Sequence, residues 1–145
     1  NLLDTNELMN EEYLTYVIKE KEYAVGLVEE IVQEAEKLKN ILPREEFNDI
    51  YDMAVRTHIT ARLQLYGGMA YFAARTYRRG AEYATDEVKN SLSKGIVGLR
   101  QTAKRINDFS GRVPSSSWKW KDDARKAEIL CQKIETEFPA FNSMS

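Results

Sequence analysis

The sequence contains one histidine, His58, and one cysteine, Cys131, the two residue types best suited to chemistry near neutral pH. A thiol beside an imidazole is a nucleophilic arrangement, because the imidazole takes up the thiol proton. Both residues fall on apolar helical stripes, however, where burial raises a thiol pKa and lowers its reactivity. We therefore interpret Cys131 as a core residue and His58 as a hydrogen-bonded residue of the core or its boundary.

Metal chemistry is limited by the same counts. A ferritin-like di-iron centre needs two Glu-x-x-His units and two more inward-facing glutamates. Here the only histidine has Val55 three residues before it. One cysteine also excludes a zinc site made of thiolates alone. The sequence predicts no catalytic, metal-binding or cofactor-binding residue and no enzyme; only His58, Cys131 or surface carboxylates leave an enzyme open.

The elements that would position these residues are helices. Apolar residues recur at steps of three and four through four segments, at about 11–42, 43–83, 85–111 and 120–139. This core stripe includes Ile31 in the first segment and Ile50 in the second. Asn10 is an expected N-cap, and Thr85 and Asp86 are the cap candidates of the third segment. The prediction is one all-α domain over residues 1–145, an antiparallel up-down-up-down four-helix bundle with two long N-terminal helices.

Composition supports a single helical domain. The 145 residues are 43% hydrophobic and 30% charged, with only 7 glycines and 3 prolines. No run approaches the roughly 18 apolar residues of a membrane span. The glycine pairs Gly67-Gly68 and Gly95/Gly98 follow no strand, so we interpret them as sites of close helix packing and not as phosphate loops.

Charge is segregated along the chain. Residues 1–55 carry five basic and fourteen acidic side chains, whereas residues 56–105 carry ten basic and three acidic ones. The first helix should therefore pair with the second and third, or a basic flank should remain for a partner. Candidate partner contacts are three arginines among aromatic residues and two loop tryptophans: Arg75, Arg78, Arg79, Trp118 and Trp120.

These arginines also raise the alternative of a nucleic-acid-binding bundle, with Arg100 and Arg105 added to them. Interleaved aromatic and basic residues grip single strands by charge and stacking. The net charge of −2 and the absence of a recognised motif disfavour this alternative. The arginines are expected instead to pair with the acidic first helix or a neighbouring domain. For the tryptophans, closing the end of the bundle is favoured over ligand or partner contact.

One stretch, at about 30–80, resembles the helical region that follows the catalytic barrel in large bacterial α-glucuronidase-type glycoside hydrolases. The shared pattern is a long helix, Leu42-Pro43, and an amphipathic helix with Phe47 and Tyr51. The Leu/Tyr/Ala-rich residues that follow are Leu63, Leu65, Tyr66, Ala70, Tyr71, Ala73 and Ala74. In that family the catalytic carboxylates lie in the barrel, so the resemblance implies no catalytic residue here and a supporting or subunit-contact role.

The expected function is therefore a non-catalytic helical scaffolding module of a larger carbohydrate-active protein. Its partner would be a neighbouring protein domain or subunit, and carbohydrate would be reached only through the parent protein. The alternative is a stand-alone adaptor bundle that binds a protein partner. Both predict a contiguous exposed apolar patch. The resemblance implies a periplasmic or secreted location; without it, the cytoplasm is expected.

Overall fold

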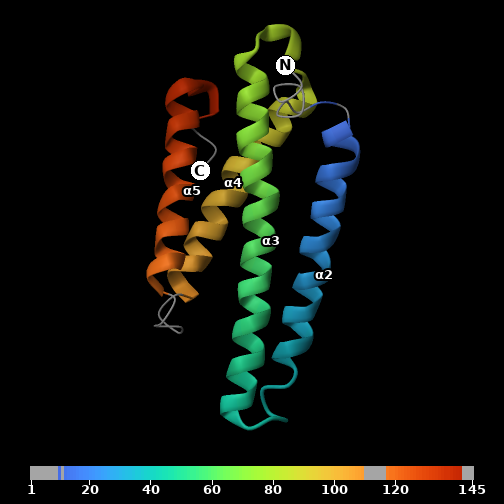
Figure 1. Cartoon of the computed structure of the whole chain (residues 1–145), viewed down its shortest axis with the longest axis vertical. Coiled ribbons are helices and arrows are strands. Elements are labelled where there is room, and N and C mark those ends of the chain that lie inside the picture. Colours follow the sequence, from blue (N-terminus) through green and yellow to red (C-terminus); the bar gives the residue numbers. More distant parts are fainter. Residues whose placement is uncertain (1–9, 11, 110–116, 142–145) are drawn as a thin grey trace.

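The computed structural model describes residues 10, 12–109 and 117–141 (Figure 1). These residues form four α-helices, with no strand among them, which confirms the all-α, four-helix prediction. The elements in chain order are the π-helix η1 (Tyr13–Val17), α2 (Ile18–Glu36), α3 (Arg44–Arg78), the 3-10 helix η2 (Ala81–Tyr83), α4 (Asp86–Phe109), α5 (Ser117–Glu137) and the 3-10 helix η5 (Pro139–Phe141).

The helices pack mainly against their neighbours in the chain: α2 on α3, α3 on α4, and α4 on α5. In Figure 1 α2 runs downward, α3 upward, α4 downward and α5 upward, with α2 and α5 on opposite sides of α3. Helices α3 and α4 therefore form the centre of the domain. Helix α2 has one principal neighbour, α3, and its opposite side faces away from the other helices.

Several helix boundaries differ from the predicted ones. Helix α2 ends at Glu36, and residues 37–42 form turns. Helix α3 is the longest, at 35 residues, but ends at Arg78 and not at Tyr83. The reason is Gly80, whose φ of 136° a helix cannot contain. Helix α5 begins at Ser117 and not at about 120, the predicted start of the fourth segment. Residues 110–116 lie outside the described part.

Two predicted caps are present. The backbone N–H of Tyr13 donates to Asn10 Oδ1 at 2.9 Å, and the N–H of Val88 donates to Thr85 Oγ1 at 3.3 Å. Each side-chain oxygen satisfies a backbone donor that has no partner within its own helix. The core lies between these helices, and its largest fully buried aliphatic residues are Ile59, Leu92, Ile96, Ile106 and Ile134.

The predicted close packing at glycine is confirmed between α3 and α4. A Cβ built on Gly95 would lie 2.6 Å from the backbone nitrogen of Ala70, and one on Gly98 would overlap the Tyr66 ring. Only a residue without a side chain allows the two helices to approach so closely. Gly67-Gly68 lie within the uninterrupted α3 helix, with the Tyr13 hydroxyl directly over Gly68.

Candidate protein-binding surface

Helix α2 carries two apolar faces. One face holds Ile18, Val25, Val32 and Ala35, which are buried in the core. A second row begins at Tyr16 in η1 and continues with Tyr23, Leu27 and Ile31 of α2. Its steps of seven, four and four residues keep to a single face of an α-helix. All four side chains of this second row are exposed, and Ile31 is 56% exposed. We call these four residues the outer row.

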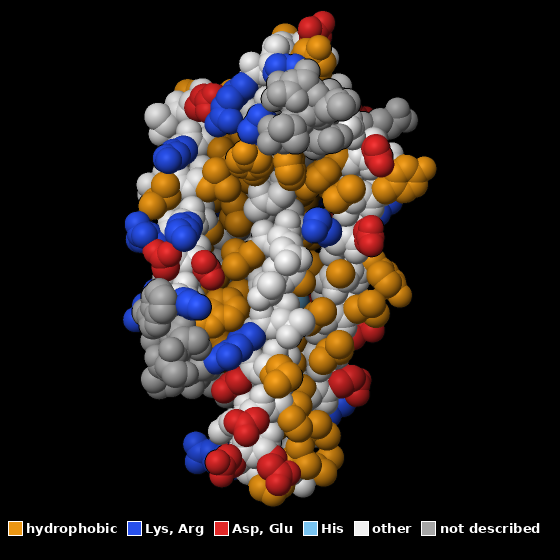
Figure 2. Space-filling view, viewed as in Figure 1, with side chains coloured by type: hydrophobic (Ala, Val, Ile, Leu, Met, Phe, Trp, Pro, Cys, Tyr) orange, Lys and Arg blue, Asp and Glu red, His pale blue; other side chains and the backbone are white. Residues whose placement is uncertain are grey.

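The outer row leads into a groove between α2 and the first turns of α3. The groove has a volume of about 320 Å³ and is mainly apolar, and its lining residues are Val28, Ile31, Asp49, Ile50, Met53, Ala54 and Thr57. Met53 is 70% exposed. Figure 2 shows hydrophobic side chains along the right-hand edge of the molecule, where α2 lies, and over the lower part of α2 and α3. Such a contiguous apolar surface is typical of protein interaction sites.

Two residues of this surface were expected elsewhere. Ile31 and Ile50 were predicted to face the core, and the structure leaves them 56% and 44% exposed, so this prediction was wrong. Steps of three and four admit both faces of α2, and no neighbouring helix of the described chain covers the outer one. The signal that sequence reasoning missed is the second period of α2, from Tyr16 to Ile31.

Acidic side chains outnumber basic ones on the two segments that form the groove. Residues 18–36 and 44–53 together carry ten acidic and three basic side chains. Asp49 lines the groove itself. One lysine just beyond α2, Lys37, is already paired with Glu34 at 2.8 Å. The groove is therefore mainly apolar, carries one carboxylate in its wall, and lies between two segments of net negative charge.

A larger recess, of about 950 Å³, lies at the turn between α2 and α3. Its lining is mostly polar and includes Asn40, Asn48 and Tyr51. The Tyr51 hydroxyl donates to Glu36 Oε1 at 3.2 Å across the recess. The recess is the weaker candidate for binding a protein, because a ligand would have to replace the water bound to its polar groups. In the groove, burial of apolar side chains is itself favourable.

His58 is buried in α3, at 6% exposure, in agreement with the predicted core position. Both of its ring nitrogens lack a hydrogen-bond partner in the described chain, so the hydrogen bond predicted for it is not seen. Burial lowers the pKa of His58, and the nearby positive charges of Arg105 and Arg62 lower it further, against a smaller opposing effect of Glu29. The ring is therefore neutral, and it does not bond to Cys131.

Arg62, one of the two arginines near His58, joins α3 to α4. Its Nε donates to Thr102 Oγ1 at 3.0 Å, and its Nη2 donates to Gln101 Oε1 at 3.3 Å. The guanidinium also lies 5.0 Å from the centre of the Tyr66 ring. These contacts hold α3 against α4 near Gly95 and Gly98, where the two helices approach closely. The role of Arg62 is therefore structural.

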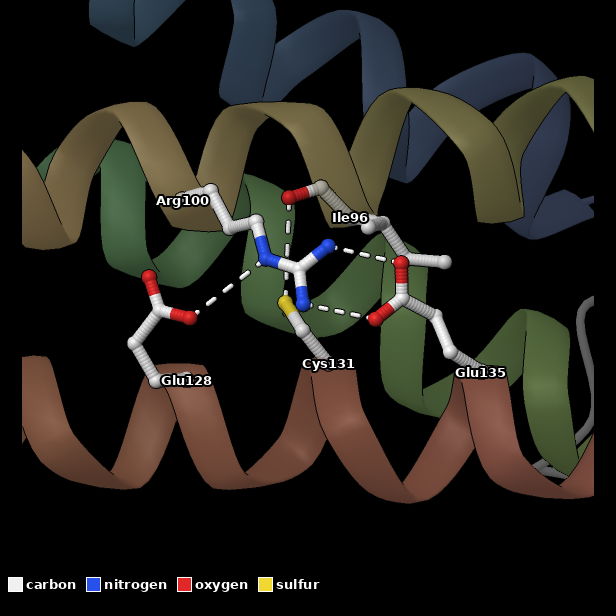
Figure 3. A network of polar contacts seen from close by, with 5 residues as sticks. All are labelled: Ile96, Arg100, Glu128, Cys131 and Glu135. Atoms are coloured by element: carbon white, nitrogen blue, oxygen red, sulfur yellow. Dashed lines mark hydrogen bonds and ion pairs between the residues drawn. The ribbon is translucent and has the colours of Figure 1, made fainter. Parts of the chain in front are cut away.

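A second polar network joins α4 to α5 (Figure 3). Arg100 makes a two-pronged ion pair with Glu135, with both N–O distances 2.6 Å, and a longer contact of 3.4 Å with Glu128. Glu135 is only 7% exposed. The Glu135 hydrogen bond is the main cause that raises the pKa of Arg100, so its charge is permanent. This ion pair holds α4 against α5.

Cys131 lies inside this network in Figure 3, with its Sγ donating to the Ile96 carbonyl at 3.7 Å. Burial raises the pKa of Cys131 to about 11, although the charge of Arg100 acts in the opposite direction. At neutral pH the residue is therefore a thiol and a poor nucleophile. Its position agrees with the predicted core role.

The predicted partner contacts at the end of α3 have neighbours within the domain. Arg78 binds Glu137 of α5 at 2.6 and 2.8 Å, and not the acidic first helix, which was one of its two expected partners. Arg75 donates to the Tyr71 hydroxyl at 2.9 Å on its own helix. Arg79 is exposed. Their role as partner contacts stays a prediction.

The two tryptophans occupy the first turn of α5 and not a loop. Trp120 is half-buried and packs against the core, as the bundle-closing interpretation expects. The side chain of Trp118 lies outside the described residues. Residues 117–119 belong to helix α5, although the serines before Trp120 suggested a loop.

Within the described ranges no group of three or more His, Cys, Asp or Glu side chains is placed to hold a metal ion. In that same part of the chain no helix has both the length and the apolar character needed to cross a membrane. No family model, curated protein or solved structure matches the chain in the three comparisons. The relation to α-glucuronidase-type enzymes stays a prediction.

Proposed function

We propose that this chain is a non-catalytic helical module that docks onto another protein surface through the outer row and groove of α2 and α3. The observation that carries the proposal is the exposed apolar surface formed by Leu27, Ile31, Ile50 and Met53. Leaving such side chains in water forgoes about 25 cal/mol for each Å² of apolar area, and a covering protein recovers this free energy.

The rest of the domain supports a passive role. The Arg100 network, the Arg62 contacts and the glycine-lined approach all join one helix to another. These contacts make α3, α4 and α5 a firm base, and α2 rests on this base with its outer face open. A rigid element that presents an apolar face is suited to carry a neighbouring domain or a partner subunit.

The finer part of the proposal is that the module belongs to a larger carbohydrate-active protein, with a free-standing adaptor as the alternative. The resemblance over residues 30–80 supports the first version. An immunoblot of the source cells separates the two: a product several times larger than 16.8 kDa favours the module, and a band near 17 kDa favours the adaptor. The large product would next be assayed on glycosides.

Photo-cross-linking tests the docking role directly. A photoreactive phenylalanine analogue replaces Met53 in the native gene product, and in a matched control it replaces Tyr83, which is exposed on η2 away from the groove. We expect position 53 to cross-link to a distant segment of the same polypeptide or to one partner protein. Equal and weak cross-linking from both positions would refute the docking role.

A further inference from the structure

The groove between α2 and α3 has the form of a seat for one more helix. Its two walls are helices, with Val28 and Ile31 on one side and Ile50 and Met53 on the other. An amphipathic helix binds such a trough by laying its apolar face between the walls. The outer row extends the apolar surface beyond the groove, along α2 and as far as Tyr16 in η1.

The charge around the groove selects the chemistry of the occupant. Ten acidic and three basic side chains lie on residues 18–36 and 44–53, and Asp49 stands in the wall. A second copy of this chain, docked through the same face, would bring Asp49 and these net negative segments against their own copies. Like charges across an interface cost several kcal/mol, so self-pairing is disfavoured and a basic partner is favoured.

We propose that the groove binds an amphipathic helix whose apolar stripe is flanked by lysine and arginine. The proposal rests on the docking function above and names the chemistry of the partner. The apolar stripe would cover Ile31 and Met53, while a basic flank would lie near Asp49. Apolar burial supplies the affinity, and the charges supply the selection among partners.

Synthetic peptides test the inference on the full chain. The probe is a fluorescent 20-residue leucine/lysine peptide with leucines at helical spacing; one control replaces every lysine by glutamate, and another scrambles the leucine spacing. We expect the helical lysine peptide to bind, by fluorescence anisotropy, at least about tenfold more tightly than either control, and less tightly as salt is raised. Equal binding of the three peptides would overturn the proposal.

Variants assign the binding to the groove. The double substitution Ile31→Gln/Met53→Gln should weaken the lysine peptide at least about tenfold, because both side chains leave the apolar floor. Tyr83→Gln, a matched change at an exposed residue outside the groove, should leave binding unchanged. Circular dichroism checks that each variant is folded. An equal loss in both variants, or in neither, would show that the groove is not the site.

Hydrogen exchange locates the bound peptide, and sedimentation shows whether the chain forms a dimer. We expect the lysine peptide to protect amides of α2 and the start of α3. Protection confined to α4 or α5 would overturn the proposal, as would a dimer of the chain that Ile31→Gln/Met53→Gln abolishes. If position 53 cross-links in the native protein while the peptide fails to bind, only the partner chemistry is wrong. If the peptide binds while position 53 does not cross-link, the docking function is wrong.

Discussion

Helices α2 and α4 both pack against α3, yet they bury very different shares of their residues. Four of the 19 residues of α2 are buried, against eleven of the 24 residues of α4. Helix α4 lies between α3 and α5, whereas α2 has α3 as its principal neighbour. An amphipathic period therefore identifies a helix, but it does not show how many neighbouring elements cover that helix.

The largest expected effect on stability comes from replacing an isoleucine of α4 by alanine, compared with the same replacement in α2. Ile96→Ala in α4 removes a fully buried side chain and should lower the free energy of unfolding by about 4 kcal/mol. Ile31→Ala in α2 removes the same atoms from a largely exposed site and should cost less than about 1 kcal/mol. Urea unfolding measures both changes. Similar losses would mean that the outer row is packed within the domain.

The ion pair of α4 has the next largest effect. Arg100→Leu leaves the buried Glu135 carboxylate without its partner and should cost about 3 kcal/mol. The matched change in the α2 region is Lys37→Leu, which breaks an exposed pair with Glu34 and should cost about 0.5 kcal/mol or less. Thermal or urea unfolding distinguishes the two.

A double variant identifies the physical cause of that loss. Arg100→Leu/Glu135→Leu removes both charges and should recover most of the stability, because no buried charge is then left unpaired. If the double variant is as unstable as Arg100→Leu alone, the loss comes from packing of the arginine stem and not from the charge.

Glycine gives the third contrast. Gly95→Ala places a methyl group against the backbone of Ala70, which cannot move aside, and should destabilise the domain by about 2 kcal/mol. Gly26→Ala in α2 meets no atom within 4 Å and should stabilise the helix by up to about 1 kcal/mol, since alanine favours helix. Opposite signs in urea unfolding are expected, and a loss in both variants would contradict the open face of α2.

The smallest effect is a pH dependence centred on His58. Its pKa is lowered in the folded protein, so the unfolded chain takes up the proton first as pH falls through about 6.5. The free energy of unfolding should therefore decrease between pH 7.5 and 5.5. His58→Leu and His58→Gln should both flatten this part of the profile, measured by urea unfolding at each pH. An unchanged profile in both variants would assign the effect to other groups.

Much of the fold was predictable because it depends on local signals. The caps at Asn10 and Thr85 and the end of α5 before Pro139 follow from backbone donors and from proline, which cannot continue a helix. The close approach at Gly95 followed from small residues beside an apolar stripe. The ends of the first two helices were placed too late. Residues 37–42 form turns and a bend although their composition is helical, and α3 stops at Arg78 because Gly80 has a positive φ.

The candidate site was predictable only in part. The apolar helical stripes predicted buried positions for His58 and Cys131, and both side chains are buried. The exposure of Ile31 and Ile50 was not foreseen, because both residues fit the core period. Likewise the pairing of Arg78 with Glu137 joins residues far apart in the chain, and charge segregation indicated a different partner.

The helices and their order follow from the spacing of apolar residues along the chain. The single histidine and single cysteine exclude a di-iron site of the ferritin type and an all-thiolate zinc site. These are properties of composition and of spacing within one helix. The tertiary structure alone decided which apolar face of α2 is buried, because two rows satisfy the helical period and only the placement of α3 covers one of them. The open row and the groove are products of that choice.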